Sequence, residues 1–271
     1  MYLLTNMESW LSSAISKNLD CSRIEHLAAP ESSFEEDEPV HVILSFHSIR
    51  NLTEIGQLCD VLRCFTRTKR IERVTFLSSY GVYEPSKTPY SEKASLSPKN
   101  FVGLSALMVE QTLQYLNGLL GLPSDIIRMF NIYGPGQNAP YVVPVVLSQV
   151  IQHGRVFVGD SAKIRDFLYM TDFMNLFTKV VEGENKGEVR IYNAGFGTPL
   201  AVHELIIKAQ EMTGGECDVI FDATRLKKEY DYDYAVADIT KIKKELGWEP
   251  KVSLEEGLAL TYQWILGRSG K

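Results

Sequence analysis

The sequence predicts an α/β fold in which a parallel, doubly wound sheet is joined to a smaller α+β lobe. Apolar runs with strand character alternate with segments of helical period through the first half of the chain. These runs lack the alternating polarity of strands that face water on one side, and strands buried on both faces are typical of parallel sheets. After about residue 135 the apolar runs become shorter and lie between longer helical segments, which indicates the second lobe.

The elements of the first half follow from these patterns. Strands are expected at residues 2–5, 22–27, 40–46, 73–79 and 124–130. Helices are expected at residues 8–19 and 52–65, and a third helix is expected to start after Pro98 and Asn100. The third helix carries an apolar face at helical spacing, which is formed by Val109, Leu113, Leu116 and Leu120. We expect that face to be buried.

The second half is expected to hold shorter strands between helices. The strands are expected at residues 155–159, 189–195 and 217–221. The helices are expected at residues 141–152, 171–183, 201–214 and 239–247. We therefore expect one domain from residues 1–135 with parts of 136–200, and a smaller lobe to which residues 136–271, approximately, contribute.

Charge and composition exclude several functions. The chain has 271 residues, 45% of them hydrophobic, which is enough for a sizeable core. Its net charge is −6, and its lysines and arginines are scattered except at residues 241–251, so no basic stripe suits a nucleic acid. The five histidines have no metal-ligand spacing, so no metal site is expected.

The cysteines and the hydropathy pattern point to the cytoplasm. The four cysteines form no CxxC motif, and we expect buried, reduced thiols. No apolar run approaches the roughly 18 residues of a membrane span, and the first residues lack the pattern of a signal peptide. No membrane association is expected.

Seven phrases along the chain resemble one family when they are taken in order. They are VTFLSSYGVYE (74–84), PYSE (89–92), VGLSALMVE (102–110), IIRMFNIYGPGQ (126–137), VFVGDSAKIRDFLYMTD (156–172), YNAGFGTPLAVHEL (192–205) and DITKIKKELGWEPKVSLEEGL (238–258). This order resembles the extended short-chain dehydrogenases/reductases that act as NAD-dependent nucleotide-sugar epimerases and dehydratases. The resemblance implies a Rossmann-like sheet for NAD(P) and a lobe for the nucleotide-sugar.

The resemblance also indicates where the catalytic groups of the family would lie. It places at Ser79 a serine that hydrogen-bonds the reacting sugar hydroxyl, and it aligns a Tyr-x-x-x-Lys pair with Val102 and Ala106. A phenol needs a nearby cation to act as a base near neutral pH. Moving the alignment by one residue offers Phe101 and Ser105, and neither transfers a proton at neutral pH. The sequence therefore predicts that the Tyr/Lys pair is lost.

The cofactor loop is predicted to be lost as well. The family's glycine-rich turn aligns with Asn6, Ser9 and Ser12, and a side chain at Ser9 would occupy space that a pyrophosphate needs. The stretch between the first strand and residues 40–46 is also shorter than in the family by about one βα unit. No cofactor is expected, and NAD or NADP is expected only if the atypical-site alternative given below holds.

The half of the pattern that binds the nucleotide-sugar is better preserved. The resemblance implies substrate contacts by Arg128 and Asn131, a loop shaped by Tyr133, and a diphosphate contact by Arg165. Two simpler explanations remain open: Arg165 pairs with Asp166 in a structural ion pair, and Asn131 caps a turn.

Weaker catalytic candidates lie near the strand ends. His47 follows a strong strand and is either a base or a hydrogen-bonded structural histidine. Tyr80 follows Ser79 directly, but no lysine is placed to lower the pKa of its phenol.

Two hypotheses follow for the function. In the first, the protein is a degenerate family member that binds a nucleotide-sugar or a related ligand without redox chemistry, as a pseudoenzyme or a non-redox enzyme. In the alternative it is an NAD(P)-dependent epimerase, dehydratase or reductase with an atypical site at Ser79, Tyr80 or His47. The resemblance further implies a homodimer formed through a helix bundle that includes the helix after Asn100.

Overall fold

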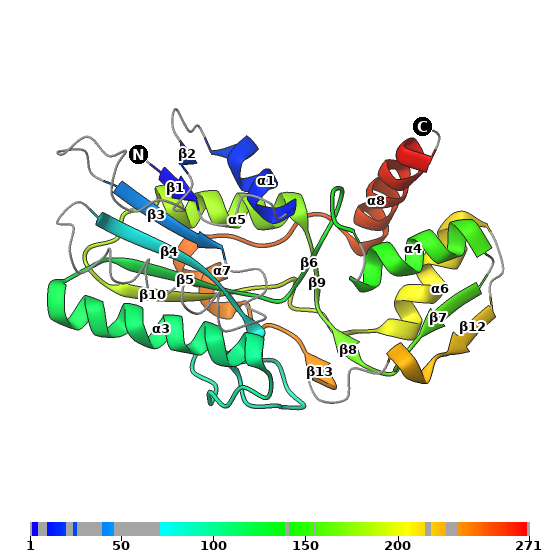
Figure 1. Ribbon diagram of the computed structural model, residues 1–271, viewed down its shortest axis with the longest axis horizontal. Helices are drawn as coiled ribbons and strands as arrows, with labels where there is room; N and C mark the ends of the chain where they lie inside the picture. The colour runs from blue at the N-terminus through cyan, green and yellow to red at the C-terminus, as the bar shows by residue number, and fades with distance from the viewer. Residues whose placement is uncertain are drawn as a thin grey trace. The chain divides into compact units, whose positions relative to one another are not determined.

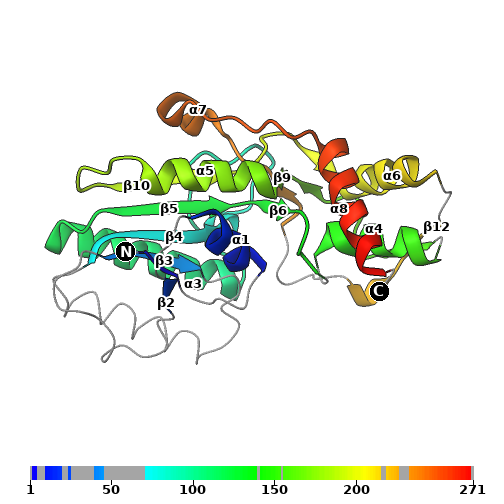
Figure 2. The same cartoon turned by 90° about the horizontal axis from the view of Figure 1, so that it is seen from above.

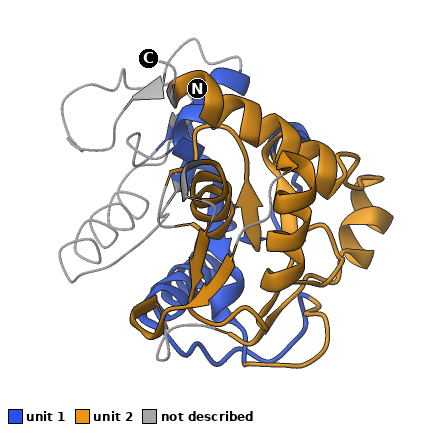
Figure 3. Ribbon diagram, turned by 90° about the vertical axis from the view of Figure 1, so that its right-hand side faces the viewer, with its two compact units in different colours: residues 1–84, 92–129, 174–193 blue, residues 85–91, 130–173, 194–271 orange. Residues whose placement is uncertain are grey.

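The computed structural model describes residues 2–4, 10–19, 24–25, 40–45, 71–138, 141–153, 155–214, 218–225 and 232–269. The chain forms two compact units, which are coloured separately in Figure 3. Unit 1 consists of residues 1–84, 92–129 and 174–193, and unit 2 of residues 85–91, 130–173 and 194–271. Neither unit is a continuous stretch, because the chain passes between them several times.

Unit 1 is built on a six-stranded sheet with the strand order β10-β5-β4-β3-β1-β2. The strands are β1 (Tyr2–Leu4), β2 (Ile24–Glu25), β3 (Val40–Ser45), β4 (Ile71–Ser79), β5 (Ser124–Met129) and β10 (Val189–Ala194). The pairings from β2 through β1, β3 and β4 to β5 are parallel. The amide of Ser124 donates to Glu188 and that of Phe130 to Ala194, so β5 and β10 also advance together. The predicted parallel α/β sheet is confirmed.

Helices cover both faces of this sheet (Figures 1 and 2). The helix α3 (Phe101–Leu120) lies on one face, and α1 (Trp10–Asn18) and α5 (Met170–Glu182) lie on the other. Central strand residues such as Ile43, Val74 and Ile126 are completely buried. Strands buried on both faces explain why their sequences are continuously apolar.

The first strands of the sheet are β1, β2 and β3, and the predicted loss of one βα unit before β3 stays a prediction. From β1 the chain runs through α1 to β2, and β3 then pairs with the other edge of β1. In the described part of the chain, β2 is the outermost strand on this side. The expected helix at 52–65 lies outside the described residues.

The helix α3 begins where the sequence predicts. Asn100 is its N-cap, and the Asn100 side chain accepts a hydrogen bond of 2.7 Å from the amide of Gly103. The expected buried face is confirmed at three positions, Val109, Leu113 and Leu116. The prediction for Leu120 is wrong: this residue is 54% exposed, because it is the last of the helix and the chain turns away at the left-handed Gly121.

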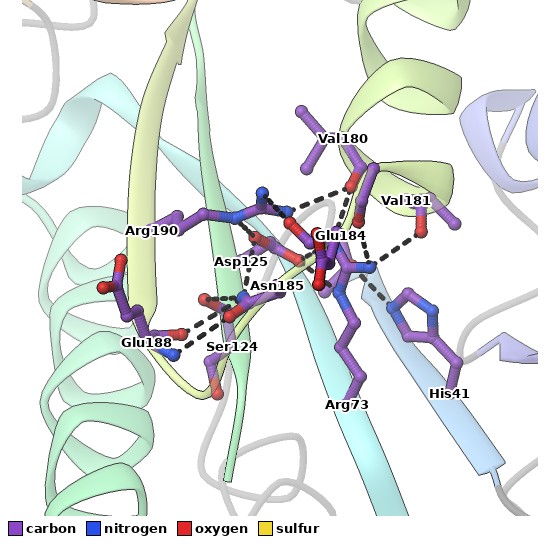
Figure 4. A network of polar contacts seen from close by, with 12 residues as sticks. His41, Arg73, Ser124, Asp125, Val180, Val181, Glu184, Asn185, Glu188 and Arg190 are labelled. Atoms are coloured by element: carbon purple, nitrogen blue, oxygen red, sulfur yellow. Dashed lines mark hydrogen bonds and ion pairs between the residues drawn. The ribbon is translucent and has the colours of Figure 1, made fainter. Parts of the chain in front are cut away.

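A polar network holds the carboxyl end of α5 on the sheet (Figure 4). Asp125 of β5 is fully buried and accepts hydrogen bonds of 2.6 Å from Nε of Arg73 and 2.6 Å from Nε of Arg190. Arg73 also donates to the carbonyl oxygens of Val180, Val181 and Gly183 at the end of α5. One guanidinium therefore satisfies both a buried acid and three helix-end carbonyls.

Unit 2 combines short strands with a helical layer. Its strand pairs are β6 (Asn131–Tyr133) with β9 (Phe167–Tyr169), and β7 (Arg155–Val158) with β12 (Asp218–Phe221). A third sheet has the order β11 (Leu200–Ala201), β8 (Ile164–Arg165), β13 (Tyr234–Ala235). The helices α4 (Val142–His153), α6 (Val202–Thr213) and α8 (Leu254–Ser269) contact one another and share a core with residues such as Leu147, Leu205 and Leu258. The short helix α7 (Thr240–Leu246) follows β13.

No helix in the described part of the chain is long and apolar enough to cross a membrane.

Candidate functional site

The carboxyl end of β4 leads directly into the predicted catalytic region. β4 ends at Ser79, and the Ser79 hydroxyl accepts a hydrogen bond of 3.1 Å from the amide of Gly81, which starts the 3-10 turn Tyr80–Val82. This turn packs against the start of α3, where a Cβ atom on Gly103 would lie 1.9 Å from the carbonyl oxygen of Gly81. Gly103 is therefore required by backbone packing.

The first two turns of α3 carry no group that transfers a proton near neutral pH. Val102 is 37% exposed, and Ala106 is buried. Ser105 is buried and donates a hydrogen bond of 2.8 Å to the carbonyl oxygen of Phe101 in its own helix. The two turns thus present an exposed valine, a buried alanine and a hydroxyl that is already bonded.

One phenol of unit 1 does lie beside a cation, but it is buried. Nη1 of Arg128 donates to the Tyr83 hydroxyl at 3.0 Å, and this hydroxyl donates to Oδ1 of Asn193 at 2.7 Å. Burial raises the pKa of Tyr83 to about 12, against the lowering effect of Arg128. Because Tyr83 has no exposed surface, it cannot act as a base on a ligand.

Arg128, which was predicted to face the substrate, is buried in unit 1 and bonded to groups of that unit. It is 1% exposed; Nε and Nη2 donate to the Glu110 carboxylate at 3.0 and 2.6 Å, and Nη1 also donates to the carbonyl oxygen of Glu92. The Glu110 carboxylate also accepts from Ser78 at 2.5 Å. Burial by itself lowers the pKa of Arg128, but the hydrogen bonds and charge interactions with Glu110 and Tyr83 together make the net shift of this pKa upward. All three guanidinium nitrogens donate inside unit 1, which does not support the predicted ligand contact.

Tyr133 likewise belongs to a core, that of unit 2. It is 1% exposed, and its ring meets the rings of Phe167 and Tyr169 edge to face at 6.2 and 5.5 Å. Its hydroxyl donates to the carbonyl oxygen of Leu254 at 3.4 Å. It shapes the loop from within the fold and presents no surface to a ligand.

Arg165 and Asp166 lie at the end of β8 in unit 2. Arg165 is 6% exposed, and its Nη1 donates to the carbonyl oxygen of Ile164 at 2.8 Å. The Asp166 carboxylate is fully buried and accepts three backbone hydrogen bonds, from Phe196 at 2.6 Å and from Gly197 and Ala237 at 2.9 Å. The carboxylate is thus held by amides rather than by the ion pair with Arg165 that was considered from the sequence.

Asn131 is tied to the same place. Its backbone amide and its side-chain Nδ2 both donate to the backbone carbonyl oxygen of Asp166, each at 3.1 Å. The side chain is only partly buried. This capping contact is the simpler of the two explanations considered from the sequence, and the diphosphate contact of Asn131 stays a prediction.

A surface hollow of about 420 Å³ lies in unit 2. It is lined by Pro89, Gly197, Ala237, Asp238, Ile239, Thr240 and Lys243. Two of these, Gly197 and Ala237, are donors to the buried Asp166 carboxylate. The ammonium of Lys243 lies 3.4 Å from the Glu249 carboxylate.

The remaining predicted residues concern the cofactor region. Ser12 is fully buried within α1. Asn6, Ser9 and His47 lie outside the described residues. Tyr80 is partly buried in the 3-10 turn after β4. Among the residues that the structure describes, no group of three or more His, Cys, Asp or Glu side chains is arranged to hold a metal ion.

Two polar residues were not expected from the sequence to organise these regions. Glu92 accepts a hydrogen bond of 2.9 Å from the amide of Asn193. Asp166 holds three amides, and the sequence offered a signal for this: an acid beside apolar residues in KIRDFLY and two closely spaced glycines in NAGFG.

Comparison with protein families identifies the class that this fold defines. The family model described as GDP-mannose 4,6 dehydratase matches residues 9–261. The chain therefore belongs to this family, among the nucleotide-sugar epimerases and dehydratases of the extended short-chain dehydrogenase/reductase type. The resemblance found in the sequence is confirmed.

Individual relatives agree with this class. The chain is 28% identical over 201 residues to the putative UDP-glucose 4-epimerase of Methanocaldococcus jannaschii, which covers 72% of this chain and 63% of that protein. It is 29% identical over 198 residues to the dTDP-4-dehydro-6-deoxyglucose reductase of Escherichia coli, which covers 69% of this chain and 59% of that protein. The chain thus matches less than two thirds of the length of both relatives.

Solved structures support the fold. MoeE5 in complex with UDP-glucose and NAD is similar to this chain with a TM-score of 0.82 and 20% identity, over 100% of this chain and 99% of that one. The Rossmann-like α/β assignment is confirmed by this likeness.

Proposed function

We propose that this chain binds a nucleotide-sugar, or a ligand of the same chemical class, and does not transfer hydride. It is then a pseudoenzyme or an enzyme whose reaction needs no redox step, and we expect it in the cytoplasm. The observation that carries this proposal is the start of α3: Val102 and Ala106 stand where the resemblance expects the Tyr/Lys pair, and neither transfers a proton.

The cofactor region supports the same proposal. NAD would supply the hydride acceptor of the family's chemistry. Val102 and Ala106 have no hydrogen-bonding side chain to offer the nicotinamide ribose, and Ser12 fills buried space where the family's turn has a glycine. The residues at the matched positions do not fit this cofactor, so the proposal contains no step that uses it.

Arg165 is the proposed anchor for the ligand. A guanidinium can bind a diphosphate with two parallel hydrogen bonds, whereas a lysine offers only a point charge. The M. jannaschii and E. coli relatives are named for UDP- and dTDP-linked sugars, and the MoeE5 structure contains UDP-glucose. These names motivate a diphosphate sugar as the ligand class.

Titration calorimetry tests the proposal with UDP-glucose, dTDP-glucose, GDP-mannose, NAD and NADP as separate probes. We expect micromolar binding of at least one sugar nucleotide and no binding of either dinucleotide. Arg165→Lys is expected to weaken that binding tenfold or more, because it keeps the charge and removes the fork. Arg155→Ala, which removes an arginine whose side chain is 61% exposed in the same unit, serves as the control and should bind normally.

The alternative is an NAD(P)-dependent enzyme with an atypical site at Ser79, Tyr80 or His47. The partly exposed Ser79 at the end of β4 favours it, because that hydroxyl remains near the surface. Micromolar NAD binding, or bound nicotinamide absorbance in the purified protein, would establish the alternative and contradict the proposal.

We also propose that a second copy of this chain covers α3. The helix exposes large apolar side chains, namely Val102, Leu104, Met108, Tyr115, Leu119 and Leu120. The charged residue of this 20-residue helix, Glu110, is buried against Arg128. An exposed, uncharged helix face is complementary to itself, as a two-fold contact requires.

Sedimentation velocity tests the dimer. Tyr115→Lys and Leu119→Lys place charges on the face and should yield a monomer. Leu266→Lys, which changes an apolar residue of α8 that is 42% exposed, is the control and should sediment like the wild type. A wild-type protein that is monomeric at high micromolar concentration would contradict the proposal.

A further inference from the structure

The carboxylate of Asp166 joins segments that lie far apart in the sequence. Phe196 and Gly197 follow Asp166 by 30 and 31 positions, and Ala237 follows it by 71. The backbone carbonyl of Asp166 binds both donors of Asn131 on β6. One residue thus fixes the start of β6, the turn at 195–197 and the segment after β13.

The turn at 195–197 is built to close over this carboxylate. A Cβ atom on Gly195 would lie 2.5 Å from Oδ2 of Asp166 and 2.5 Å from Cβ of Ala237, which no side chain tolerates. Gly197 has a φ of 82°, a conformation that favours glycine. The two glycines let the turn and the segment at Ala237 approach the same oxygen.

The segment after β13 is held from its other side as well. The amide of Tyr90 donates to the carbonyl oxygen of Val236 at 2.9 Å. The amide of Asp238 donates to the carbonyl oxygen of Tyr90 at 2.8 Å. With Ala237 bound to Asp166, this segment is held on both sides. Residues 237–240 line the hollow of unit 2, so the Asp166 contact fixes part of its wall.

The charge of Asp166 is held at a cost. Burial raises the pKa of this carboxyl to about 6, and the three backbone hydrogen bonds offset only part of that effect. At neutral pH the ionised group therefore destabilises the fold relative to a neutral side chain of the same shape. If residue 166 served stability alone, a neutral side chain would suffice there. The three converging backbone amides, however, need an acceptor with two oxygens, which a carboxylate provides.

We infer that Asp166 is a positioning residue of the ligand site of unit 2, which sets Gly197 and Ala237 in the wall of the hollow relative to Arg165 and Asn131. The inference rests on the proposed function. It also makes the hollow part of the site, because two of the three residues whose amides bind Asp166, Gly197 and Ala237, line this hollow. Asp166 has no exposed surface and acts through these segments rather than by touching the ligand.

Asp166→Asn tests this inference with UDP-glucose as the probe. The variant keeps the size of the side chain but turns an –NH₂ group toward at least one of the three donors, which must then move away. We expect its affinity for UDP-glucose to fall tenfold or more at pH 7, because Gly197 and Ala237 line the hollow and lose part of their common acceptor. The amide NMR signals of Phe196, Gly197 and Ala237 should shift and exchange faster with solvent.

Asp172→Asn is the matched control. Asp172 is also a buried acid of unit 2. Its carboxylate accepts hydrogen bonds from the amides of Lys251 and Val252 at 2.9 and 2.8 Å, and these two donors lie far from Arg165 in the sequence. This variant should lower the melting temperature and leave the affinity for UDP-glucose unchanged. Gly195→Ala, which pushes the turn off the carboxylate by another route, should reproduce the loss of affinity.

Two outcomes overturn the inference and differ from each other. If the wild type binds UDP-glucose and Asp166→Asn binds it equally well, the positioning role is wrong and the proposed function stands. If the wild type binds none of the sugar nucleotides, the proposed function fails and the inference fails with it.

Discussion

The two units hold their buried charges in different ways. In unit 1, buried acids meet arginines: Glu110 pairs with Arg128, and Asp125 lies between Arg73 and Arg190 (Figure 4). Each pair joins elements of the sheet layer, α3 to β5 in the first case and β4, β5 and β10 in the second. These contacts lock strands and helices together.

In unit 2, buried acids meet backbone amides. Asp166 accepts from three amides and Asp172 from two, and these amides belong to loops rather than to strand centres. A carboxylate without a cation costs more to bury than a paired one, but it can fix the course of a loop. The comparison teaches that unit 1 uses charge to stabilise a scaffold, whereas unit 2 uses it to shape loops, which is where binding sites usually lie.

The largest effect is expected at the centre of unit 1. Glu110→Gln leaves the buried guanidinium of Arg128 without its counter-charge, and it should lower the free energy of unfolding by about 3–5 kcal/mol. Urea unfolding followed by circular dichroism measures this. The double variant Glu110→Leu/Arg128→Met removes both charges and should lose less than the sum of the two single variants. A loss below about 1 kcal/mol for Glu110→Gln would contradict the view that paired buried charges stabilise unit 1.

The pH dependence of stability tests whether the unpaired charge of Asp166 in unit 2 is unfavourable. The folded-state pKa of about 6 lies above the ordinary value of 3.8, so between these values the folded protein binds a proton that the unfolded chain releases. The free energy of unfolding should therefore fall as the pH rises from about 4 to about 6, by up to ~3 kcal/mol from this group. The difference between wild type and Asp166→Asn, measured by urea unfolding across this range, isolates the effect. A difference that does not change with pH would show that the charge costs nothing.

The network at the end of α5 should give a smaller effect, because both of its arginines are partly exposed. Asp125→Asn leaves Arg73 and Arg190, whose side chains are 13% and 17% exposed, without their shared counter-charge. We expect a loss of about 2 kcal/mol in the free energy of unfolding and faster hydrogen exchange at the end of α5. Arg155→Met, at a more exposed pair, should change stability by less than about 0.5 kcal/mol.

Two glycines of α3 should respond in opposite ways, and the smaller effect is expected at Gly118. Gly103→Ala would place its Cβ atom 1.9 Å from the backbone carbonyl oxygen of Gly81, so that backbone must move, and it should cost about 3 kcal/mol. Gly118→Ala has open space around the new methyl group and should stabilise the helix by about 0.5–1 kcal/mol. Thermal unfolding measures both variants. Equal melting temperatures of the two variants would contradict close packing at the start of α3.

Much of the fold of unit 1 could be predicted from the sequence. The strands predicted at residues 40–46 and 73–79 correspond to β3 and β4, and the Asn100 cap and the spacing of Val109, Leu113 and Leu116 located α3. These signals are local, because hydrophobic period and capping depend on neighbours within a few residues. The prediction for Leu120 was wrong because its exposure depends on where the chain turns, which its spacing in the sequence does not show.

The elements of unit 2 were harder to predict. The strands β6, β8, β9, β11 and β13 have two or three residues each and were not expected, because such short runs show no period. The helix α8 was also not expected, although Leu258 and Ile265 lie seven positions apart on its buried face. The seven-residue spacing of these two positions is a local signal of this helix.

The candidate site also combines features that are visible in the sequence with features that depend on tertiary contacts. The absence of ionisable side chains at Val102 and Ala106 is a property of the sequence itself. The roles of Arg128 and Tyr133 are not, because an arginine that faces a ligand and one that is buried against Glu110 look alike in the sequence. Burial and partnership come from residues that lie far away along the chain.

The sequence by itself determined the main elements of unit 1, the parallel character of its sheet and the family to which the chain belongs. Tertiary structure alone decided which polar groups meet. The Asp166 carboxylate depends on amides 30, 31 and 71 positions away, and no local pattern encodes such a meeting. The physical reason is that secondary structure follows from the properties of neighbouring residues, whereas the environment of a charge follows from the packing of the whole unit.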